Sequence, residues 1–308
     1  MPYQLPNCVL MIRPSYFAFN PGTAESNSFQ TQLSGLDPFE IRQLALDEFD
    51  NFVSLLEAWD IEVLVFEDSE IPHKPDAVFP NNWFSTHLNG WLITYPMLDP
   101  MRRNEQRDDI IQTLTNRFGY IHRNELKNFE SEEKFLEGTG SLVLDREQKT
   151  AYTSLSPRSH PDVIEAWAKL TGFKTITFNT LGPDNMPIYH TNVMMCIGDN
   201  FAVVGTDCID IPDREKVINN LEKSGKKIIH LSNDQVFDSF AGNMLALSNK
   251  QGDRLLVMST SAKRSLNAEQ IKTFNDLNLE LVAAPLSIIE TVGGGSARCM
   301  MAEIVIPQ

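Results

Sequence analysis

The sequence predicts an α/β fold in which one strand–turn–strand–helix–strand unit recurs five times around a common axis. Two observations lead to this prediction. Pairs of short apolar strands flank turns such as Leu88-Asn89-Gly90 and Gly198-Asp199-Asn200, and a segment with helical periodicity follows each pair. The starts of these strand pairs then recur every ~50 to 60 residues, a spacing at or just above that of repeat architectures. A ring of such units places loops from several repeats around one central channel.

The expected strands are short and apolar, and polar turn residues separate the two members of each pair. A third strand is expected after the helix of each unit. We expect strands over residues 8–12, 61–66, 78–86, 90–95, 141–144, 150–155, 193–197, 201–205, 244–247, 254–258, 281–284, 286–289 and 300–306.

The expected helices carry apolar side chains at intervals of three or four residues, which places those side chains on one face. The pattern is clearest over residues 39–59, where Leu44, Phe52 and Leu56 recur. The other helices are expected over residues 102–118, 161–170, 213–224 and 266–277. No linker or low-complexity tract separates the units, so we expect a single domain over residues 1–308.

Composition excludes several classes of function. The 308 residues can bury a large core, and 42% hydrophobic with 22% charged residues is ordinary for a globular protein. A net charge of −15 argues against nucleic acid or an anionic membrane as a partner. We find neither a signal-peptide pattern nor an apolar run near the ~18 residues of a membrane span. The four cysteines lack CxxC spacing, so we expect no disulfide framework, no metal site and a cytoplasmic location.

The stretch Thr291–Met300 contains three consecutive glycines followed by Cys299. Glycines allow backbone conformations and close approaches that a Cβ would block. Because apolar runs flank this stretch, we expect Cys299 to lie where a glycine-rich loop enters a strand. Such a loop can present a thiol to a cleft. From these residues alone, a small buried hydrophobic cysteine is an equally good interpretation.

In a ring, the segments that open the first strand of each unit face the axis together. These segments are residues 75–83, 135–140, 189–192 and the Cys299 loop. Between them they carry a thiol, an imidazole, two carboxylates and several amides. A nucleophilic thiol needs a nearby base and a third group that orients that base. His190 on its own would more often be a core histidine, but its neighbour Asn192 and the Cys299 loop favour a site.

These motifs resemble a known family. Gly-Gly-Gly-x-x-Arg-Cys-Met resembles the nucleophile loop of arginine deiminases and their relatives, the guanidino-modifying (pentein) superfamily. Residues 75–79 and 136–138 resemble the opening and glutamate motifs of dimethylarginine hydrolases, and residues 189–192 resemble the His-x-Asp segment of deiminases. Residues 101–105 and 153–158 resemble arginine-bearing segments that hold the carboxylate of the substrate. The resemblance covers nearly the whole chain, and the arginine-deiminase-related, citrulline-utilisation hydrolase subgroup is the most similar.

The resemblance implies a five-bladed α/β propeller and a cofactor-free hydrolase or amidinotransferase of a small amino acid. It implies that Cys299 is the nucleophile, that His190 protonates the leaving nitrogen and that Glu137 orients His190. The substrate-binding residues that it implies are Asp76, Asn82, Asn192, Arg103 and Arg158. Whether Arg102 or Arg103 faces the site stays open, as does a homo-oligomeric state.

Three positions depart from the family pattern. Asn82 and Asn192 stand where deiminases usually carry aspartates, and Gly140 replaces the aspartate of the Glu-Gly-Gly-Asp motif. Aspartates pair with a cationic guanidinium, whereas an amide offers an acceptor and a donor without charge. Because a buried guanidinium without a counter-charge is costly, we expect a neutral ureido substrate, namely citrulline, hydrolysed to ornithine, ammonia and CO2. Arginine deimination, amidinotransfer and a non-catalytic binding role are the alternatives.

Overall fold

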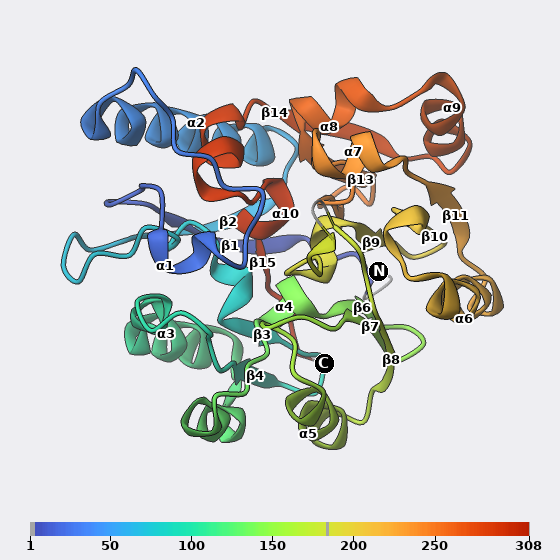
Figure 1. Ribbon diagram of the computed structural model, residues 1–308, viewed down its shortest axis with the longest axis horizontal. Helices are drawn as coiled ribbons and strands as arrows, with labels where there is room; N and C mark the ends of the chain where they lie inside the picture. The colour runs from blue at the N-terminus through green and yellow to red at the C-terminus, as the bar shows by residue number, and fades with distance from the viewer. Residues whose placement is uncertain (1–3, 183–184, 308) are drawn as a thin grey trace.

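The structure is a computed structural model that describes residues 4–182 and 185–307. Within these residues, five three-stranded sheets stand in a ring (Figure 1). The predicted α/β propeller is confirmed. The sheet strands are β1 (Cys8–Arg13), β2 (Glu62–Glu67), β3 (Phe84–Thr86), β4 (Trp91–Thr94), β5 (Ile121–Arg123), β6 (Val143–Asp145), β7 (Thr150–Ser154), β8 (Lys174–Phe178), β9 (Met195–Ile197), β10 (Phe201–Val204), β11 (Lys227–His230), β12 (Leu245–Ser248), β13 (Arg254–Ser259), β14 (Glu280–Ala284) and β15 (Ala302–Glu303).

Four of the sheets follow one pattern: the first two strands form an antiparallel hairpin, and the third runs parallel to the second. A parallel neighbour needs a long crossover, which the helix of each unit supplies. The fifth sheet joins the two ends of the chain. Strand β15 lies antiparallel to β1, with Val9 opposite Glu303, and β1 lies parallel to β2. The last strand therefore closes the ring.

The crossover helices lie on the rim of the ring, and the strands lie inside it (Figure 1). Helix α2 begins at a capping box, in which Asp37 accepts from the Glu40 amide and Glu40 accepts from the Asp37 amide. The crossover helices are α2 (Pro38–Ala58), α3 (Asp108–Phe118), α5 (Pro161–Thr171), α6 (Ile211–Lys223), α8 (Thr260–Ser265) and α9 (Ala268–Asp276). None of the helices in the described part of the chain is long and apolar enough to cross a membrane.

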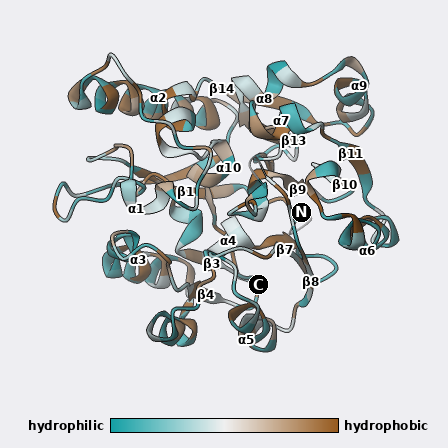
Figure 2. Cartoon of the chain, in the orientation of Figure 1, coloured by the Kyte–Doolittle hydropathy of each residue, from teal (hydrophilic) through white to brown (hydrophobic). Residues whose placement is uncertain are grey.

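The apolar core follows the seams between neighbouring sheets. One seam, for example, packs Leu10 of β1 against Leu92 of β4 and Leu114 of α3. Figure 2 shows the inner strands coloured mainly as hydrophobic, whereas the rim helices carry hydrophilic stretches. The ring is thus held together by burial of side chains from adjacent units.

Short helical turns precede several inner strands, where the sequence predicted strands or the loops that enter them. They are η1 (Pro80–Asn82), α4 (Gly138–Ser141), η5 (Thr191–Val193) and α10 (Ala297–Met300). Strand 78–86 is therefore reduced to β3, and strand 300–306 to β15. The remaining short helices are α1 (Pro21–Ala24), η2 (Arg102–Glu105), η3 (Glu125–Glu132), η6 (Thr206–Cys208), α7 (Asn233–Phe237) and η7 (Ile289–Gly293).

Two further predictions of secondary structure were wrong. The expected helix 102–118 is divided into η2 and α3, since Gln106 and Arg107 have extended backbone. The expected strand 286–289 leads instead into the helical turn η7. The carboxylate of Glu48 accepts hydrogen bonds from the amides of Ile288 and Ile289, which stabilises this turn.

His87 belongs to a buried polar chain between neighbouring units. Its Nε2 lies 2.8 Å from Ser85 Oγ, which lies 2.6 Å from the Tyr95 hydroxyl, and Trp167 donates to that hydroxyl. Burial and the nearby Arg146 charge together lower the pKa of His87 to about 3, although Glu303 opposes this shift. The folded protein therefore keeps this imidazole neutral.

We predict that His87→Gln makes the folded protein less sensitive to acid. The unfolded chain binds a proton at His87 below a pKa of about 6.5. The stability that neutral His87 contributes is therefore complete above that pH and is lost as the pH falls toward 3. Between pH 7 and pH 5 the unmodified protein should lose ~2 kcal/mol of unfolding free energy that the variant keeps. Urea unfolding at both pH values measures this difference, and equal losses in the two proteins would contradict the prediction.

Candidate active site

One pocket collects residues from distant parts of the sequence. It is lined by Asn27, Asp76, Phe79, Asn82, Arg102, Arg158, Tyr189, His190, Gly293, Gly294, Gly295 and Cys299. The turn α10, which carries Cys299, and the adjoining turn α4 lie near the middle of the ring in Figure 1. The free space inside is about 10 Å³, which is room for about one water molecule. An amino acid can enter only if the surrounding segments move.

His190 and Glu137 form a buried pair between two inner turns. Glu137 immediately precedes α4, and His190 immediately precedes η5. The His190 Nε2 atom lies 2.8 Å from Glu137 Oε2, and both side chains are almost completely buried. Because Glu137 occupies Nε2, the other ring nitrogen, Nδ1, is the one left for chemistry.

The protonation states of this pair follow from its surroundings. Burial lowers the pKa of His190 to about 4, although Glu137 opposes this shift. Burial alone would raise the pKa of Glu137, but Arg158, the His190 hydrogen bond and Arg102 hold it below its ordinary value. At neutral pH the pair is thus a carboxylate that accepts Nε2–H from a neutral imidazole. Neutral His190 can accept a proton at Nδ1.

The thiol of Cys299 lies in the turn α10 and is 2% exposed. Its sulfur receives a hydrogen bond from Asn243 Nδ2 at 3.2 Å and a longer one from Asn192 Nδ2 at 3.5 Å. The glycine loop before it takes a shape that suits glycine, since Gly294 has a φ of +62°. The Tyr189 hydroxyl donates to the carbonyl of Gly294, which anchors the loop against the His190 segment.

A buried ionic cluster surrounds one end of the pocket. Arg102 donates to both carboxylate oxygens of Glu105, at 2.8 and 3.0 Å, and to Asn82 Oδ1 at 3.0 Å. The same guanidinium lies 3.6 Å from Asp76 and 3.6 Å from Glu137. Burial raises the pKa of Glu105 to about 7 and also raises that of Asp76, although Arg102 opposes both shifts.

The loop between β1 and α2 contacts the other end of the pocket. Arg158 donates to Ser26 Oγ at 2.8 Å and to the Thr23 carbonyl at 3.3 Å. Asn27 lines the pocket and donates to the carbonyl of Gly294 at 3.4 Å. This loop therefore joins Arg158 to the glycine loop and occupies donors of Arg158.

Gly140 lets two site residues approach the backbone of α4. A Cβ at this position would lie 2.4 Å from Asn82 Nδ2 and 2.8 Å from His190 Nδ1. Such distances require one of those groups to shift. The absence of the aspartate that the resemblance would place here thus has a steric reason.

The structure brings most of the predicted site residues together. Asp76, Asn82, Arg158, His190 and Cys299 line the pocket, and Glu137 and Asn192 bond to lining residues. The exception is Arg103. Its guanidinium donates to the carbonyls of Met97 and Leu98 and lies 3.8 Å from Glu130, outside the pocket lining.

Arg102, which the sequence left as an alternative to Arg103, lines the pocket instead. Sequence reasoning also did not assign roles to Asn243 and Tyr189. The sequence does carry a feature that points to Asn243: it opens the fourth repeat, just as Asn82 and Asn192 open theirs.

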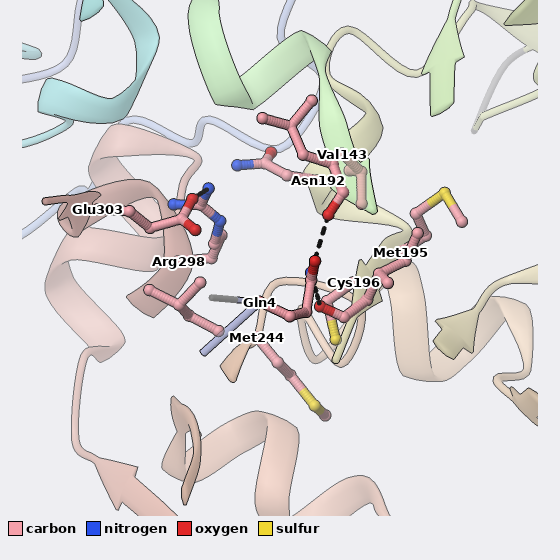
Figure 3. Close-up of a pocket in the computed structure, with 11 residues that line it drawn as sticks. Gln4, Val143, Asn192, Met195, Cys196, Met244, Arg298 and Glu303 are labelled. Atoms are coloured by element: carbon pink, nitrogen blue, oxygen red, sulfur yellow. Dashed lines mark hydrogen bonds and ion pairs between the residues drawn. The ribbon is translucent and has the colours of Figure 1, made fainter. Parts of the chain in front are cut away.

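A second cavity, of about 30 Å³, adjoins Asn192 (Figure 3). Arg298 points into it and pairs with Glu303 at 2.6 Å, and Arg146 contacts the same carboxylate at 3.2 Å. The charge that precedes Cys299 in the sequence is therefore neutralised by Glu303. Across residues 4–182 and 185–307, no cluster of three or more His, Cys, Asp or Glu residues could hold a metal ion.

Comparison with known proteins gives one family match and several structural matches. The sequence model of the family described as N,N dimethylarginine dimethylhydrolase, eukaryotic, matches residues 13–306. A search of curated protein sequences finds no match.

Three solved structures illustrate the structural similarity. The N-terminal domain of ArgZ, an arginine dihydrolase from the ornithine–ammonia cycle in cyanobacteria, has a TM-score of 0.73 and 15% identity, over 97% of this chain and 98% of that one. A variant of AgrE in complex with L-arginine has a TM-score of 0.75 and 16% identity, over 97% of this chain and 40% of that one. A variant of DDAH from Pseudomonas aeruginosa in complex with citrulline has a TM-score of 0.67 and 13% identity, over 97% and 100%. These similarities show a shared fold.

We predict that Gly140→Ala lowers kcat by ~100-fold or more, because displacement of a catalytic group by about 1 Å has this order of effect. The added methyl group should also cost ~1–3 kcal/mol of stability. Ammonia release from citrulline, the substrate expected from the sequence, and urea unfolding measure the two effects.

Gly172→Ala is the matched control for this prediction. Gly172 has a φ of +74°, so alanine is strained there, but a Cβ would meet no atom within 4 Å. This variant should lose stability and keep its activity. Full activity in Gly140→Ala would show that the site tolerates the methyl group.

Proposed function

The chain belongs to the N,N-dimethylarginine dimethylhydrolase family of pentein hydrolases, which cleave guanidino C–N bonds, and we propose that its own substrate is citrulline. In this proposal Cys299 is the nucleophile, and the products are ornithine, ammonia and CO2. The main observation that supports citrulline rather than arginine is the orientation of the Asn82 amide.

Arg102 determines which way the Asn82 amide faces. A guanidinium only donates hydrogen bonds, so the atom of Asn82 that receives Arg102 Nη2 at 3.0 Å must be the carbonyl oxygen. The amide nitrogen of Asn82 then lies on the side of Gly140 and His190. One of its two hydrogens is donated to Asn81 Oδ1 at 2.9 Å, and the other is a donor for the pocket. A ureido group has a carbonyl oxygen that accepts such a bond, whereas a guanidinium has only donors.

The charges that line the pocket favour the same choice. The ionisable lining groups include two guanidinium groups, Arg102 and Arg158, and one carboxylate, Asp76. Asp76 Oδ2 accepts from Asn20 at 2.8 Å, while Oδ1 has no hydrogen-bond partner among the described residues. These two arginines are paired with Glu105 and Glu137, so Asp76 is the carboxyl group that remains for a cationic substrate, and burial raises its pKa. The N–H groups of a neutral ureido substrate can instead donate to Asp76 Oδ1.

The proposed reaction uses His190 as a proton carrier. Neutral His190 takes the proton of the Cys299 thiol at Nδ1, and the sulfur attacks the ureido carbon. His190 then gives that proton to the departing nitrogen as one C–N bond breaks, which leaves a thiocarbamate on Cys299. Glu137 stabilises the imidazolium through Nε2–H.

The second half of the reaction consumes water. His190 removes a proton from the water, which attacks the thiocarbamate carbon and expels the Cys299 thiolate. The carbamate released in this step decomposes to CO2 and the second amine. One citrulline and one water thus give ornithine, ammonia and CO2, and the free enzyme is restored.

Arg158 is the arginine that we propose as the partner of the substrate α-carboxylate. Arg102 is held by short bonds to Glu105 and Asn82, and Arg103 lies outside the pocket, whereas Arg158 contacts its glutamate, Glu137, only at 3.4 Å. The bonds from Arg158 to Ser26 and Thr23 would then be exchanged for bonds to the carboxylate when the β1–α2 loop opens.

We further propose one domain over residues 1–308 and a cytoplasmic location. The pairing of β15 with β1 supports the first, because the ring closes only when both segments are present. The four buried, free cysteines are compatible with a reducing compartment.

We predict that the purified protein releases ornithine, ammonia and CO2 from citrulline and that Cys299→Ser lowers this rate ~1,000-fold or more. The assay compares citrulline with arginine and dimethylarginine in buffer without an amine acceptor. Mass spectrometry follows the adduct on Cys299, and circular dichroism verifies that the variant is folded.

The other outcomes identify the alternatives. Faster consumption of arginine, with citrulline as the product, would make the protein an arginine deiminase. Turnover that requires an added amine would make it an amidinotransferase. A near-normal rate in Cys299→Ser would contradict the proposed mechanism, in which Cys299 is the nucleophile.

We predict that Asn82→Asp shifts the ratio of kcat/KM for citrulline to that for arginine by ~10-fold or more toward arginine. The carboxylate keeps the acceptor for Arg102, and it replaces the N–H that would bind the ureido oxygen with a counter-charge for a guanidinium. Steady-state kinetics with both substrates measure the ratio. An unchanged ratio would mean that Asn82 does not select the substrate.

A further inference from the structure

Asn243 lies before β12 and is completely buried, and the structure provides partners for both ends of its amide. Its Nδ2 donates to Cys299 Sγ at 3.2 Å and to the Asn192 carbonyl at 2.9 Å. Its Oδ1 accepts from the main-chain amides of Arg298 at 3.0 Å and Cys299 at 3.4 Å. One side chain thus connects the sheet of β12, β13 and β14 with the His190 segment and with the turn that carries the thiol.

These partners also fix the orientation of the amide. Main-chain N–H groups only donate, so the atom that faces the amides of Arg298 and Cys299 must be the oxygen. The nitrogen must then face the sulfur. Since Nδ2 carries two hydrogens and the Asn192 carbonyl takes one, the other is directed at Cys299 Sγ.

We propose that Asn243 is a further catalytic residue, which stabilises the thiolate of Cys299 through its N–H and positions α10 through its carbonyl oxygen. The proposal rests on the proposed function only in taking Cys299 as the nucleophile. It adds a residue from the unit of β12, β13 and β14, and the longer hydrogen bond from Asn192 supplements that of Asn243.

The surroundings of the sulfur explain why an amide donor is needed. The ionisable groups that line its pocket are Asp76, Arg102, Arg158, Tyr189 and His190, and Glu290, Arg298 and Glu303 lie on the adjoining segments. The three arginines among them are each paired with a glutamate, namely Glu105, Glu137 and Glu303. A neutral ureido substrate brings no positive charge to the sulfur. Hydrogen bonds from amides then supply the local stabilisation of the anion.

Alkylation can report on Cys299 without interference from the other thiols. Burial raises the pKa of Cys8, Cys196 and Cys208 to about 12 in each case. These three therefore stay protonated over the pH range in which an alkylating reagent would be used. Peptide mass spectrometry assigns each modified residue directly.

The experiment measures the pH dependence of iodoacetamide alkylation at Cys299 in the full chain and in Asn243→Asp. Aspartate keeps the oxygen that accepts from the two amides of α10, loses the N–H to sulfur and adds a negative charge beside it. We expect the midpoint of the alkylation profile to rise by ~1 pH unit or more, and kcat/KM for citrulline at neutral pH to fall ~10-fold or more.

Asn233→Asp is the matched control. Asn233 Oδ1 receives a hydrogen bond from Cys208 Sγ at 3.5 Å, so this substitution places a charge beside a different cysteine, outside the pocket. It should leave the Cys299 profile and the citrulline kinetics unchanged. Thermal unfolding verifies that each variant is folded. If Asn243→Asp does not fold, the Asn243→Ala profile, which also lacks the N–H, decides the question.

Unchanged midpoints in the folded Asn243 variants would overturn the proposal and leave the proposed function intact. The two fail separately, because alkylation needs no substrate, whereas the proposed function fails if Cys299→Ser retains its activity. A purely structural role for Asn243 would lower the unfolding temperature without moving the pH profile, and that result too would overturn the proposal.

Discussion

The site depends on the closure of the ring by β15. This strand is only two residues long, but its surroundings hold the end of the chain firmly. Thr86 Oγ1 donates to the Glu303 carbonyl and accepts from the Val305 amide, and Tyr120 donates to the Val305 carbonyl. Only Met300 and Met301 separate Cys299 from β15, so these contacts limit where the thiol can lie. The pairing of β15 with β1 thus positions the proposed nucleophile.

The centre of the ring carries an unusual density of buried charge. Arginines and carboxylates alternate there, and each charge faces at least one of the opposite sign within 4 Å. Removal of one partner would leave the other buried and unpaired, which costs far more than the pair itself contributes. The cluster therefore constrains the positions of its members closely. It holds Asn82 and Glu137 in fixed orientations, and through Glu137 it holds the imidazole of His190.

Much of this arrangement can be predicted from the sequence. The repeat of strand pairs and helices gives the ring, and the spacing of Asn82, Asn192 and Cys299 from the starts of their strands brings them to one axis. The inner helical turns could not be predicted, because hydrogen bonds from other units stabilise them. The sequence also could not show which of Arg102 and Arg103 faces the pocket. Neighbouring residues on a turn point in different directions, and only the packed cluster shows that Arg102 faces inward.

The pairing of Val9 with Glu303 joins opposite ends of the described chain. One edge of β1 stays unpaired until β15 is in place, so the first described strand is completed by the last one. A contact between such distant residues forms slowly, since the entropy of closing so long a loop opposes it. A chain that ends before residue 299 would keep most of the pocket residues and lack the sulfur of Cys299. The pocket is therefore completed only by the segment that β15 holds in the ring.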